Sequence, residues 1–421
     1  PIGPENRHVG KSVRRGNGPA DKASRSPGDA IVTYKAGRHF LQIPGPSNVP
    51  DRVLRAIDRP TIDHRGPEFT ELFHTVFDGL KKVFNCSGPV LIFPSSGSGC
   101  WEASLVNTLS PGDGVLMVET GYFALLWQDI ALKLGLYVDI IPGDWRNGVD
   151  PQIIEQKLLE DSNHVIKAVA IVHNETSTGV TSDIAGIRQA MNKAGHPALL
   201  LVDAISSLGS TEYQQDEWGI DVTIGGSQKG LMLPPGLGFN AVSEKAQAAM
   251  RHANLPRSYW DWESVLTANQ AGSFPYTPAT NLLFGLEEAL AMLFEEGLEN
   301  VYLRHKRLAE ATRTAVATWN LENVCLNAHE YSNSLTSVLL PEGCDADGLR
   351  GLILDRFDMS LGTGLGKIKG KVFRIGHLGW FNELMLAGTL SGIEMGLELA
   401  DIPFKKGGVG AALDFLVKQN S

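Results

Sequence analysis

The stretch that decides the fold is VLIFPSSGSG, residues 90–99, in which four consecutive apolar residues run into serine and glycine. A short continuous apolar run fits a strand that is covered on both faces. The small residues that follow let backbone N–H groups approach an anion, and a helix expected over about residues 100–109 adds a favourable dipole. The segment therefore predicts a phosphate-binding turn, although a tight strand-to-helix turn with an N-cap fits the same residues. It is neither a Walker loop, nor a GxGxxG fingerprint, because position 102 is Glu, nor a GxSxG elbow.

Four further apolar runs of the same kind alternate with helical patterns along the chain. They cover residues 115–118, 168–172, 198–202 and 222–224. A helix is predicted from Phe69 to Phe84, because its apolar residues recur at steps of three and four after Pro67. Continuous apolar strands between helices predict an α/β fold with a mostly parallel sheet between helix layers.

A long helical pattern over residues 284–318, broken at Gly297, leads out of this region. The segment after it has fewer strand patterns and contains residues 334–340, a glycine-rich turn at 362–370, and residues 371–375. We therefore expect a large domain over residues 39–295 and a smaller C-terminal α+β domain over residues 296–421.

The chain has 421 residues with 37 basic and 47 acidic side chains, which give a formal net charge of −10. This acidic excess argues against sequence-independent binding of nucleic acid, because phosphates are neutralised by a surplus of Lys and Arg. No run of about 18 apolar residues could span a bilayer, so we do not expect a membrane protein. The four cysteines have no CxxC spacing, which favours a reduced, cytoplasmic setting and gives no basis for a metal site.

Residues 1–38 differ in composition from the rest of the chain. They carry eight basic and three acidic side chains, so their net charge is +5 and that of the remaining chain is −15. They are rich in Gly, Pro and Ser and have no apolar run, which is typical of an N-terminal arm rather than of a signal peptide. An arm that lies across a partner subunit and a transit peptide both fit this composition.

Polar residues that end apolar runs are candidates for chemistry, because ligands of doubly wound sheets bind beyond the carboxyl ends of the strands. Asp203 follows four aliphatic residues, where it would either cap the next helix or hold a cationic ring nitrogen. Lys229 lies among small residues after the run 222–224. Partial desolvation there would lower its pKa and favour the free amine that a Schiff-base lysine needs.

A second glycine-rich stretch, residues 362–367, ends in Gly-Lys. A Walker loop would need Gly at position 361 and Ser or Thr at position 368, where the chain has Leu361 and Ile368. We interpret the stretch as a mobile turn near a site.

Several short motifs, taken together and in order, resemble those of the class V pyridoxal-phosphate aminotransferases, and most of all the serine–glyoxylate and alanine–glyoxylate branch. The motifs are Pro44-Gly45-Pro46, Ser96-Gly97-Ser98, His173-Asn174-Glu175-Thr176, Asp203, Ser227-Gln228-Lys229, Tyr276-Thr277-Pro278 and Arg374-Ile375-Gly376. The resemblance covers about residues 39–400 and implies the type I fold of PLP-dependent transferases. It leaves the N-terminal arm without a counterpart.

The resemblance implies catalytic roles for three residues. Lys229 would form the Schiff base with the cofactor, pyridoxal 5′-phosphate, and move a proton to and from the substrate. Asp203 would pair with the protonated ring nitrogen of the cofactor. Arg374 would bind the substrate carboxylate as a bidentate fork.

The resemblance also implies binding roles for the other matching residues. Those implied for the cofactor are Ser96, Gly97, Ser98, Phe123, Thr176, Ile205, Gln228, Tyr276 and Thr277. Phe123 would stack on the ring where alanine–glyoxylate relatives often have Trp, with Tyr122 as an alternative. Thr277 would reach the phosphate from the other subunit of a homodimer. Pro44 and Gly45 would lie beside the substrate.

The activity that the resemblance implies is ping-pong transamination between an amino acid and a 2-oxo acid. An amino acid, first of all L-serine, would give its amino group and leave as hydroxypyruvate, and glyoxylate would leave as glycine. The alternatives within the class are alanine–glyoxylate, aspartate–glyoxylate and pyridoxamine–pyruvate aminotransferases. Residues near Tyr34, Asn48 and Trp260 could decide between them.

Two alternatives lie outside the aminotransferases. A cysteine desulfurase would need a reactive cysteine on a mobile loop, for which Cys344 is the candidate. A binding module with the basic arm as a nucleic-acid contact would have no need of Lys229, Asp203 and Arg374 together.

Overall fold

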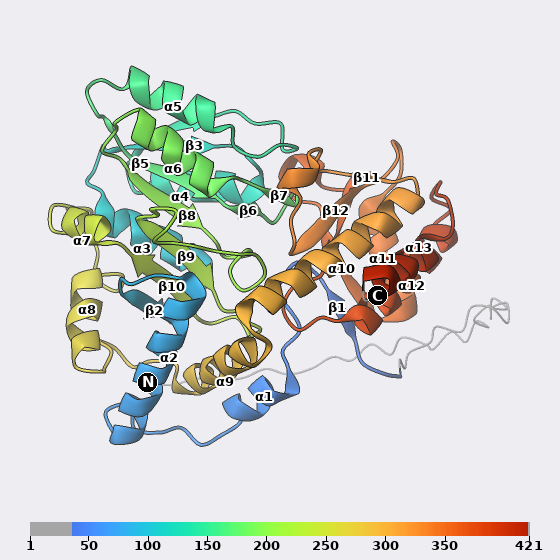
Figure 1. The fold of residues 1–421 in the computed structure, drawn as a ribbon, viewed down its shortest axis with the longest axis horizontal. Helices are drawn as coiled ribbons and strands as arrows, with labels where there is room; N and C mark the ends of the chain where they lie inside the picture. Colours follow the sequence, from blue (N-terminus) through green and yellow to red (C-terminus); the bar gives the residue numbers. More distant parts are fainter. Residues whose placement is uncertain (1–35, 420–421) are drawn as a thin grey trace, which may run out of the picture. The chain divides into compact units, whose positions relative to one another are not determined.

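A seven-stranded sheet lies at the centre of the region that spans residues 90–242 (Figure 1). The structure is a computed structural model and describes residues 36–419. Across the sheet the strands are β2 (Val90–Phe93), β10 (Gly238–Val242), β9 (Val222–Gly226), β8 (Leu199–Asp203), β5 (Ile166–Val172), β3 (Gly114–Val118) and β4 (Tyr137–Ile141). Strand β10 is antiparallel to both of its neighbours, and the other neighbouring strands are parallel. The prediction of a mostly parallel sheet is confirmed.

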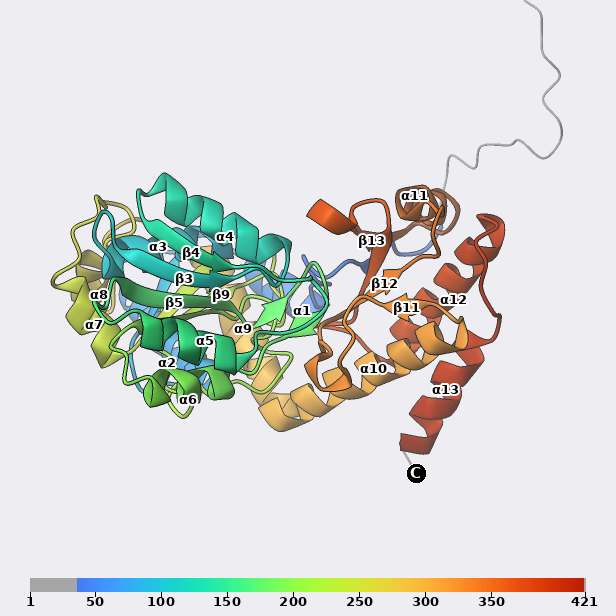
Figure 2. The same ribbon diagram turned by 90° about the horizontal axis from the view of Figure 1, so that it is seen from above.

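Helices cover both faces of this sheet (Figure 2). One face packs against α2 (Pro67–Phe84), α5 (Pro151–Glu160), α6 (Ile184–Lys193) and α9 (Thr280–Glu296). The other packs against α3 (Gly97–Thr108), α4 (Tyr122–Lys133), α7 (Glu244–Met250) and α8 (Trp262–Gln270). Along β2, successive side chains alternate between the two cores, which is why the strand is a continuous apolar run. Helix α1 (Asp51–Ile57) packs on α9.

The boundaries of helix α2 follow from its sequence. Pro67 is its first residue, where the missing N–H is not needed and the fixed φ suits a helix. Asn85 ends it in the left-handed conformation, with φ of 51°, a role that Asn tolerates better than most residues. The helix predicted from Phe69 to Phe84 is therefore confirmed.

A second sheet of five strands contains most of the C-terminal strands. Its order is β1 (Phe40–Gln42), β13 (Met359–Thr363), β14 (Val372–Gly376), β12 (Leu335–Leu339) and β11 (Glu322–Asn323). Its core is shared with α10 (Leu298–Thr318), α11 (Ala346–Phe357), α12 (Glu383–Leu399) and α13 (Gly408–Gln419). The short strands β6 (Asn174–Glu175) and β7 (Val180–Thr181) pair with each other, and η1 (Ala328–Glu330) and η2 (Gly366–Ile368) are single 3₁₀ turns.

Strand β1 joins this second sheet, parallel to β13, although it stands before the first sheet in the sequence. The division into domains over residues 39–295 and 296–421 stays a prediction. The N-terminal arm, predicted over residues 1–38, lies outside the described residues except for residues 36–38. Tyr34 also lies outside the described residues.

The break predicted at Gly297 is present, because this residue separates α9 from α10 with φ of 83°. The range predicted for the glycine-rich turn, residues 362–370, is longer than the observed turn. Gly362 and Thr363 belong to β13 and pair with Arg374 and Phe373 of β14, so the turn begins at residue 364. The pairing partner lies ten or more residues along the chain, and glycine content alone does not reveal it.

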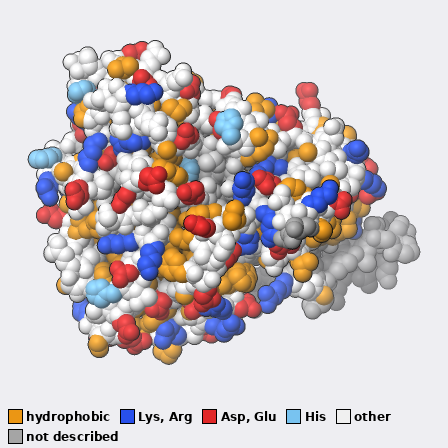
Figure 3. Space-filling model, in the orientation of Figure 1, with side chains coloured by type: hydrophobic (Ala, Val, Ile, Leu, Met, Phe, Trp, Pro, Cys, Tyr) orange, Lys and Arg blue, Asp and Glu red, His pale blue; other side chains and the backbone are white. Residues whose placement is uncertain are grey.

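Charged side chains of both signs are interspersed on the face shown in Figure 3, with apolar atoms scattered between them. The acidic excess is therefore not gathered into one patch on this face. Among residues 36–419, no helix has the length and apolar character that crossing a membrane requires.

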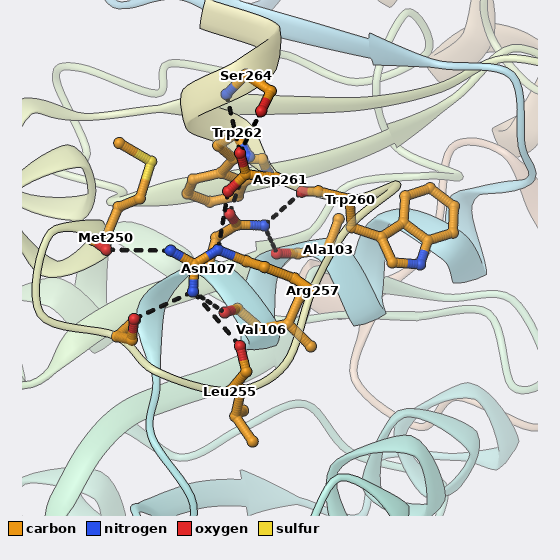
Figure 4. A network of polar contacts seen from close by, with 11 residues as sticks. Ala103, Val106, Asn107, Met250, Leu255, Arg257, Trp260, Asp261, Trp262 and Ser264 are labelled. Carbon is orange, nitrogen blue, oxygen red and sulfur yellow. Dashed lines mark hydrogen bonds and ion pairs between the residues drawn. The ribbon is translucent and has the colours of Figure 1, made fainter. Parts of the chain in front are cut away.

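The C-terminal end of α3 is tied to residues 250–264 by a network of polar contacts (Figure 4). Asn107 donates to the carbonyl oxygen of Trp260 at 2.7 Å, and its own side-chain oxygen accepts from the N–H of Trp262 at 2.9 Å. Arg257 adds a bond to the carbonyl oxygen of Val106 at 3.1 Å. The network fixes one end of the helix whose other end is the predicted phosphate turn.

Replacing Asn107 by Ala should lower the free energy of unfolding by about 2–4 kcal/mol, because it leaves the partly buried carbonyl oxygen of Trp260 and the buried N–H of Trp262 without these partners. Urea-induced unfolding of the full chain measures the change. The matched control is Asn192→Ala, an exposed position within α6, which should change the value by less than about 0.5 kcal/mol. Equal effects of the two substitutions would show that the network contributes nothing to stability.

Candidate active site

The carboxyl ends of β2, β8 and β9 lie at the same edge of the seven-stranded sheet, because these strands run in the same direction. Asp203 is the last residue of β8, and Gln228 and Lys229 follow β9. The predicted phosphate turn follows β2 and leads into α3. The fold thus brings together residues that are more than 100 positions apart in the sequence.

The first turn of α3 presents hydrogen-bond donors that have no partner among the described residues. Ser96 is the N-cap, but its side chain makes no capping hydrogen bond, and both Ser96 and Ser98 are exposed. The N–H groups of Gly97 and Ser98 make no described hydrogen bond, as is usual at the start of a helix, whereas that of Gly99 donates to the Ser96 carbonyl oxygen at 3.1 Å. At Gly97 there is no room for a side chain, since an added Cβ would lie 2.2 Å from Cδ1 of Ile205.

Gln228 lies beside this turn with an unsatisfied group. Its Oε1 is buried and has no hydrogen-bond partner among the described residues. A Cβ built on Gly226 would lie 3.3 Å from Ile205 and 3.2 Å from that same oxygen. Because Ile205 also lies against Gly97, the Gln228 amide and the start of α3 pack around the same side chain. Small residues, free N–H groups and hydroxyls together suit a bound phosphate.

Asp203 is buried, and each of its carboxylate oxygens accepts one hydrogen bond. Oδ1 accepts from the N–H of Ile205 at 2.7 Å, and Oδ2 from the indole N–H of Trp101 at 3.1 Å. Burial raises the pKa of this carboxyl to about 7. The chain forms turns rather than a helix between β8 and β9, so the alternative that Asp203 caps a following helix is wrong.

Lys229 is buried as well, and the loop after β1 covers it. Its ammonium group donates to the carbonyl oxygen of Pro44, and an added Cβ on Gly45, where φ is 109°, would lie 2.4 Å from the lysine side chain. Ser47 donates from its hydroxyl to the Lys229 carbonyl oxygen at 2.8 Å. Burial, with a smaller effect of the Arg374 charge, lowers the pKa of Lys229 to about 7.

Arg374 is a strand residue of β14 but not a surface one, since 7% of it is exposed. Nε donates to the carbonyl oxygen of Thr363 and Nη1 to that of Thr176, each at 2.7 Å. Nη2 has no partner among residues 36–419. Burial lowers the pKa of the guanidinium to about 10, so it stays charged at neutral pH. A held guanidinium with free N–H groups suits a carboxylate ligand.

Thr176 and Phe123 lie on neighbouring segments. The hydroxyl of Thr176 donates to Ser206 at 2.8 Å, which leaves its lone pairs as acceptors. Phe123 is half-buried in the first turn of α4, and Tyr122 beside it lies against Gly366 in the turn after β13. Both aromatic residues therefore remain candidates for a ring-stacking role.

Tyr276 and Thr277 do not join the other predicted residues through any described hydrogen bond. The hydroxyl of Tyr276 donates to the carbonyl oxygen of Ile92 at 3.2 Å, and its ring stacks on Tyr259 with centroids 4.6 Å apart. Thr277 is exposed. Its role toward a second subunit stays a prediction.

Two buried residues at the site, Trp101 and Glu175, were not predicted from the sequence. Trp101 bonds to Asp203, but in the sequence it is one more apolar residue of a helix. Glu175 accepts hydrogen bonds from the N–H groups of Ala124 and Ser177, at 3.2 and 3.0 Å, and so fixes the start of α4. Its place in the motif at residues 173–176 was a signal, since a carboxylate among buried residues needs such partners.

Cys344, the candidate for a desulfurase, lies in the turn after β12 and packs against the core of the five-stranded sheet. No described hydrogen bond joins its side chain to the carboxyl edge of the seven-stranded sheet. The geometry gives the desulfurase alternative no support.

Comparison with known proteins identifies the family. The chain matches the family described as Aminotransferase class-V over residues 39–364. It is similar to serine–glyoxylate aminotransferase of Methylorubrum extorquens, at 49% identity over 91% of this chain and 98% of that protein. It is also similar to L-aspartate–glyoxylate aminotransferase of Paracoccus denitrificans, at 44% identity over 88% of this chain and 94% of that protein. The crystal structure of pyridoxamine–pyruvate aminotransferase from Mesorhizobium loti has a TM-score of 0.85 and 28% identity, covering 92% of this chain and 98% of that one. The chain therefore belongs to the class V aminotransferases.

Replacing Asp203 by Asn should stabilise the chain without added ligand more at pH 8 than at pH 5. Because burial raises the pKa of Asp203 in the folded state to about 7, the folded state binds a proton that the unfolded state releases between about pH 4 and pH 7. The wild type thus loses stability as the pH rises through this range, by on the order of 4 kcal/mol, and the variant does not.

Urea-induced unfolding at pH 5, 6, 7 and 8 measures this difference. The control is Asp129→Asn, an exposed residue of α4 that pairs with Lys133, and its difference from the wild type should stay constant over the range. A difference for Asp203→Asn that does not change with pH would contradict the buried carboxyl described above.

Proposed function

We propose that the chain is a pyridoxal-phosphate-dependent transaminase that moves an amino group from L-serine to glyoxylate. The products are hydroxypyruvate and glycine, and the donor leaves as its keto acid before the acceptor binds. The observation that carries this proposal is that Asp203, Lys229 and Arg374 are all buried and that the charges of Asp203 and Arg374 both act on Lys229. The predicted phosphate turn lies at the same edge of the sheet. The similarity to a serine–glyoxylate aminotransferase supports the choice of serine and glyoxylate.

The residues at the site fit pyridoxal 5′-phosphate. Its phosphate suits the first turn of α3, where Gly97 leaves no room for a side chain and the hydroxyls of Ser96 and Ser98 are exposed. The NH₂ of the Gln228 amide can donate to it as well. Its protonated ring nitrogen suits the Asp203 carboxylate, which has no cationic hydrogen-bond partner of its own in the described chain. Its aldehyde suits the Lys229 amine, whose pKa burial lowers to about 7, so that the neutral form is abundant at neutral pH.

When bound, this cofactor supplies an electron sink for the charge that forms as the substrate α-carbon loses its proton. The protein residues orient that bond and move the proton. Arg374, held by the carbonyl oxygens of Thr363 and Thr176, would bind the substrate carboxylate and so fix the position of the α-carbon. Lys229 Nζ would take the α-proton and later return one, a role for which a pKa near the working pH is best.

The proposal includes a homodimer in which Thr277 of each subunit completes the phosphate site of the other. The exposure of Thr277, which makes no described hydrogen bond within its own chain, supports this arrangement. We place the enzyme in the cytoplasm, since all four cysteines are free thiols.

Replacing Lys229 by Ala should abolish turnover, with at least a 10⁴-fold loss of kcat, because the variant has no amine to move the α-proton. Binding of the cofactor should remain measurable, since the phosphate turn and Asp203 are unchanged. Steady-state assays and equilibrium dialysis give the two quantities. The control is Lys245→Ala, another lysine whose pKa burial lowers but which pairs with Asp221 near α7, and it should keep turnover. Appreciable transamination by the Lys229 variant would refute the assignment.

A half-reaction screen should identify the amino donor. With the cofactor-loaded protein and no acceptor, L-serine should change the visible absorbance in a single turnover faster than L-alanine, L-aspartate or pyridoxamine. Stopped-flow absorbance measures the rates, and glyoxylate added afterwards should restore the original spectrum. A faster reaction with L-aspartate, as the name of the Paracoccus relative suggests, or with pyridoxamine would replace serine as the donor and leave the reaction class intact.

A further inference from the structure

Trp101 makes a direct contact with the residue that the proposed function pairs with the cofactor. Its indole N–H donates to Oδ2 of Asp203 at 3.1 Å. Trp101 lies in α3, four residues after Gly97 of the phosphate turn, and is 2% exposed. The same helix therefore carries the anion-binding turn at its start and this hydrogen bond one turn later.

The indole of Trp101 is held in place by a second tryptophan. The rings of Trp101 and Trp127 stack with centroids 5.9 Å apart and an interplanar angle of 14°. Trp127 belongs to α4, the helix whose first turn carries Phe123, and is fully buried. The direction of the Trp101 N–H is thus set by packing between two helices, so the hydrogen bond does not depend on a mobile side chain.

Both oxygens of Asp203 face groups that can only donate. The indole nitrogen of Trp101 and the main-chain nitrogen of Ile205 each carry a hydrogen and accept none. A protonated carboxyl would have to direct its own hydrogen away from both, whereas a carboxylate satisfies both. The two donors therefore favour the ionised form, against burial and the nearby Glu175 charge, which favour the neutral form.

We propose that Trp101 is a positioning residue that holds Asp203 ionised and in a fixed orientation toward a cationic ring nitrogen. This inference rests on the proposed function, because it assumes that such a ring binds beside Asp203. Trp101 touches neither substrate nor reacting atoms, and acts through Asp203. The charged groups that also act on Asp203 are Glu175 and Lys229, and both stay in place when Trp101 is replaced.

The neighbouring tryptophan provides a matched control. The indole nitrogen of Trp127 is buried and has no hydrogen-bond partner among the described residues. Trp101→Phe and Trp127→Phe therefore remove the same atoms from the same stacked pair, but the first alone removes a hydrogen bond on Asp203. Any effect of lost packing is expected in both variants.

The first measurement uses the full chain without cofactor. Stability is compared with and without Asp203→Asn in three backgrounds, the wild type, Trp101→Phe and Trp127→Phe, from pH 5 to pH 9. The difference changes with pH only up to the pKa of Asp203 in the folded chain, so the pH at which it levels off reports the ionisation of Asp203. Loss of one donor to a carboxylate should move this end point upward by about one pH unit in Trp101→Phe, a tenfold change in the ionisation constant. The end point should not move in Trp127→Phe.

The second measurement uses the cofactor-loaded enzyme. Trp101→Phe should lower kcat by about tenfold and leave KM for the amino donor within about twofold, because Arg374 is unchanged. Trp127→Phe should lower kcat much less. Equal end points and equal kcat values in the two Phe variants would overturn the inference. If the wild type proved to have no transaminase activity, the proposed function would fail, while the end points would still decide whether Trp101 sets the ionisation of Asp203.

Discussion

Burial of a carboxyl and an amine at one edge of the seven-stranded sheet is the constraint on which the rest of the site depends. An ionised group removed from water costs several kcal/mol unless other charges or hydrogen bonds compensate. Between Asp203 and Lys229 the compensation is incomplete, since the pKa of the acid is raised and that of the base lowered, both to about 7. Each group therefore changes charge near neutral pH. A cationic ring beside the acid and an aldehyde beside the base would each relieve the cost of burying its neighbour.

The second sheet also contributes residues to this edge. Strand β1 pairs with β13, and the loop that follows it reaches Lys229 through the Pro44 carbonyl oxygen. Gly45 lets that loop approach so closely, since an added Cβ would overlap the lysine side chain. Arg374 enters from β14 and is held by one carbonyl oxygen from each region. The site thus requires the segment before the first sheet and the strands after it.

Much of the site could be predicted from local sequence, because strand ends and small residues have a direct chemical meaning there. Asp203 ends an apolar run and Lys229 follows another, so their positions at the sheet edge needed no knowledge of tertiary contacts. The contact between Trp101 and Asp203 joins residues 102 positions apart and leaves no local pattern. Strands β4 and β10 were missed for a different reason. Strand β4 is a partly exposed edge strand, and β10 begins with glycine and contains the buried Asn240. Neither is a continuous apolar run.

The net charge of the chain and the charge of its proposed substrates have the same sign, and the structure explains why they are compatible. Residues 39–421 carry a formal charge of −15, but charges of both signs are interspersed on the face in Figure 3 and act through water. At physiological ionic strength such charges are screened beyond about 8 Å. Arg374 is enclosed, where screening is weak, and remains protonated at neutral pH because burial lowers its pKa only to about 10. The open N–H groups at the start of α3 act at hydrogen-bond range in the same way. The enclosed Arg374 and the open donors at the start of α3 would therefore favour an anionic ligand at short range, and the acidic surface would have little influence on that preference.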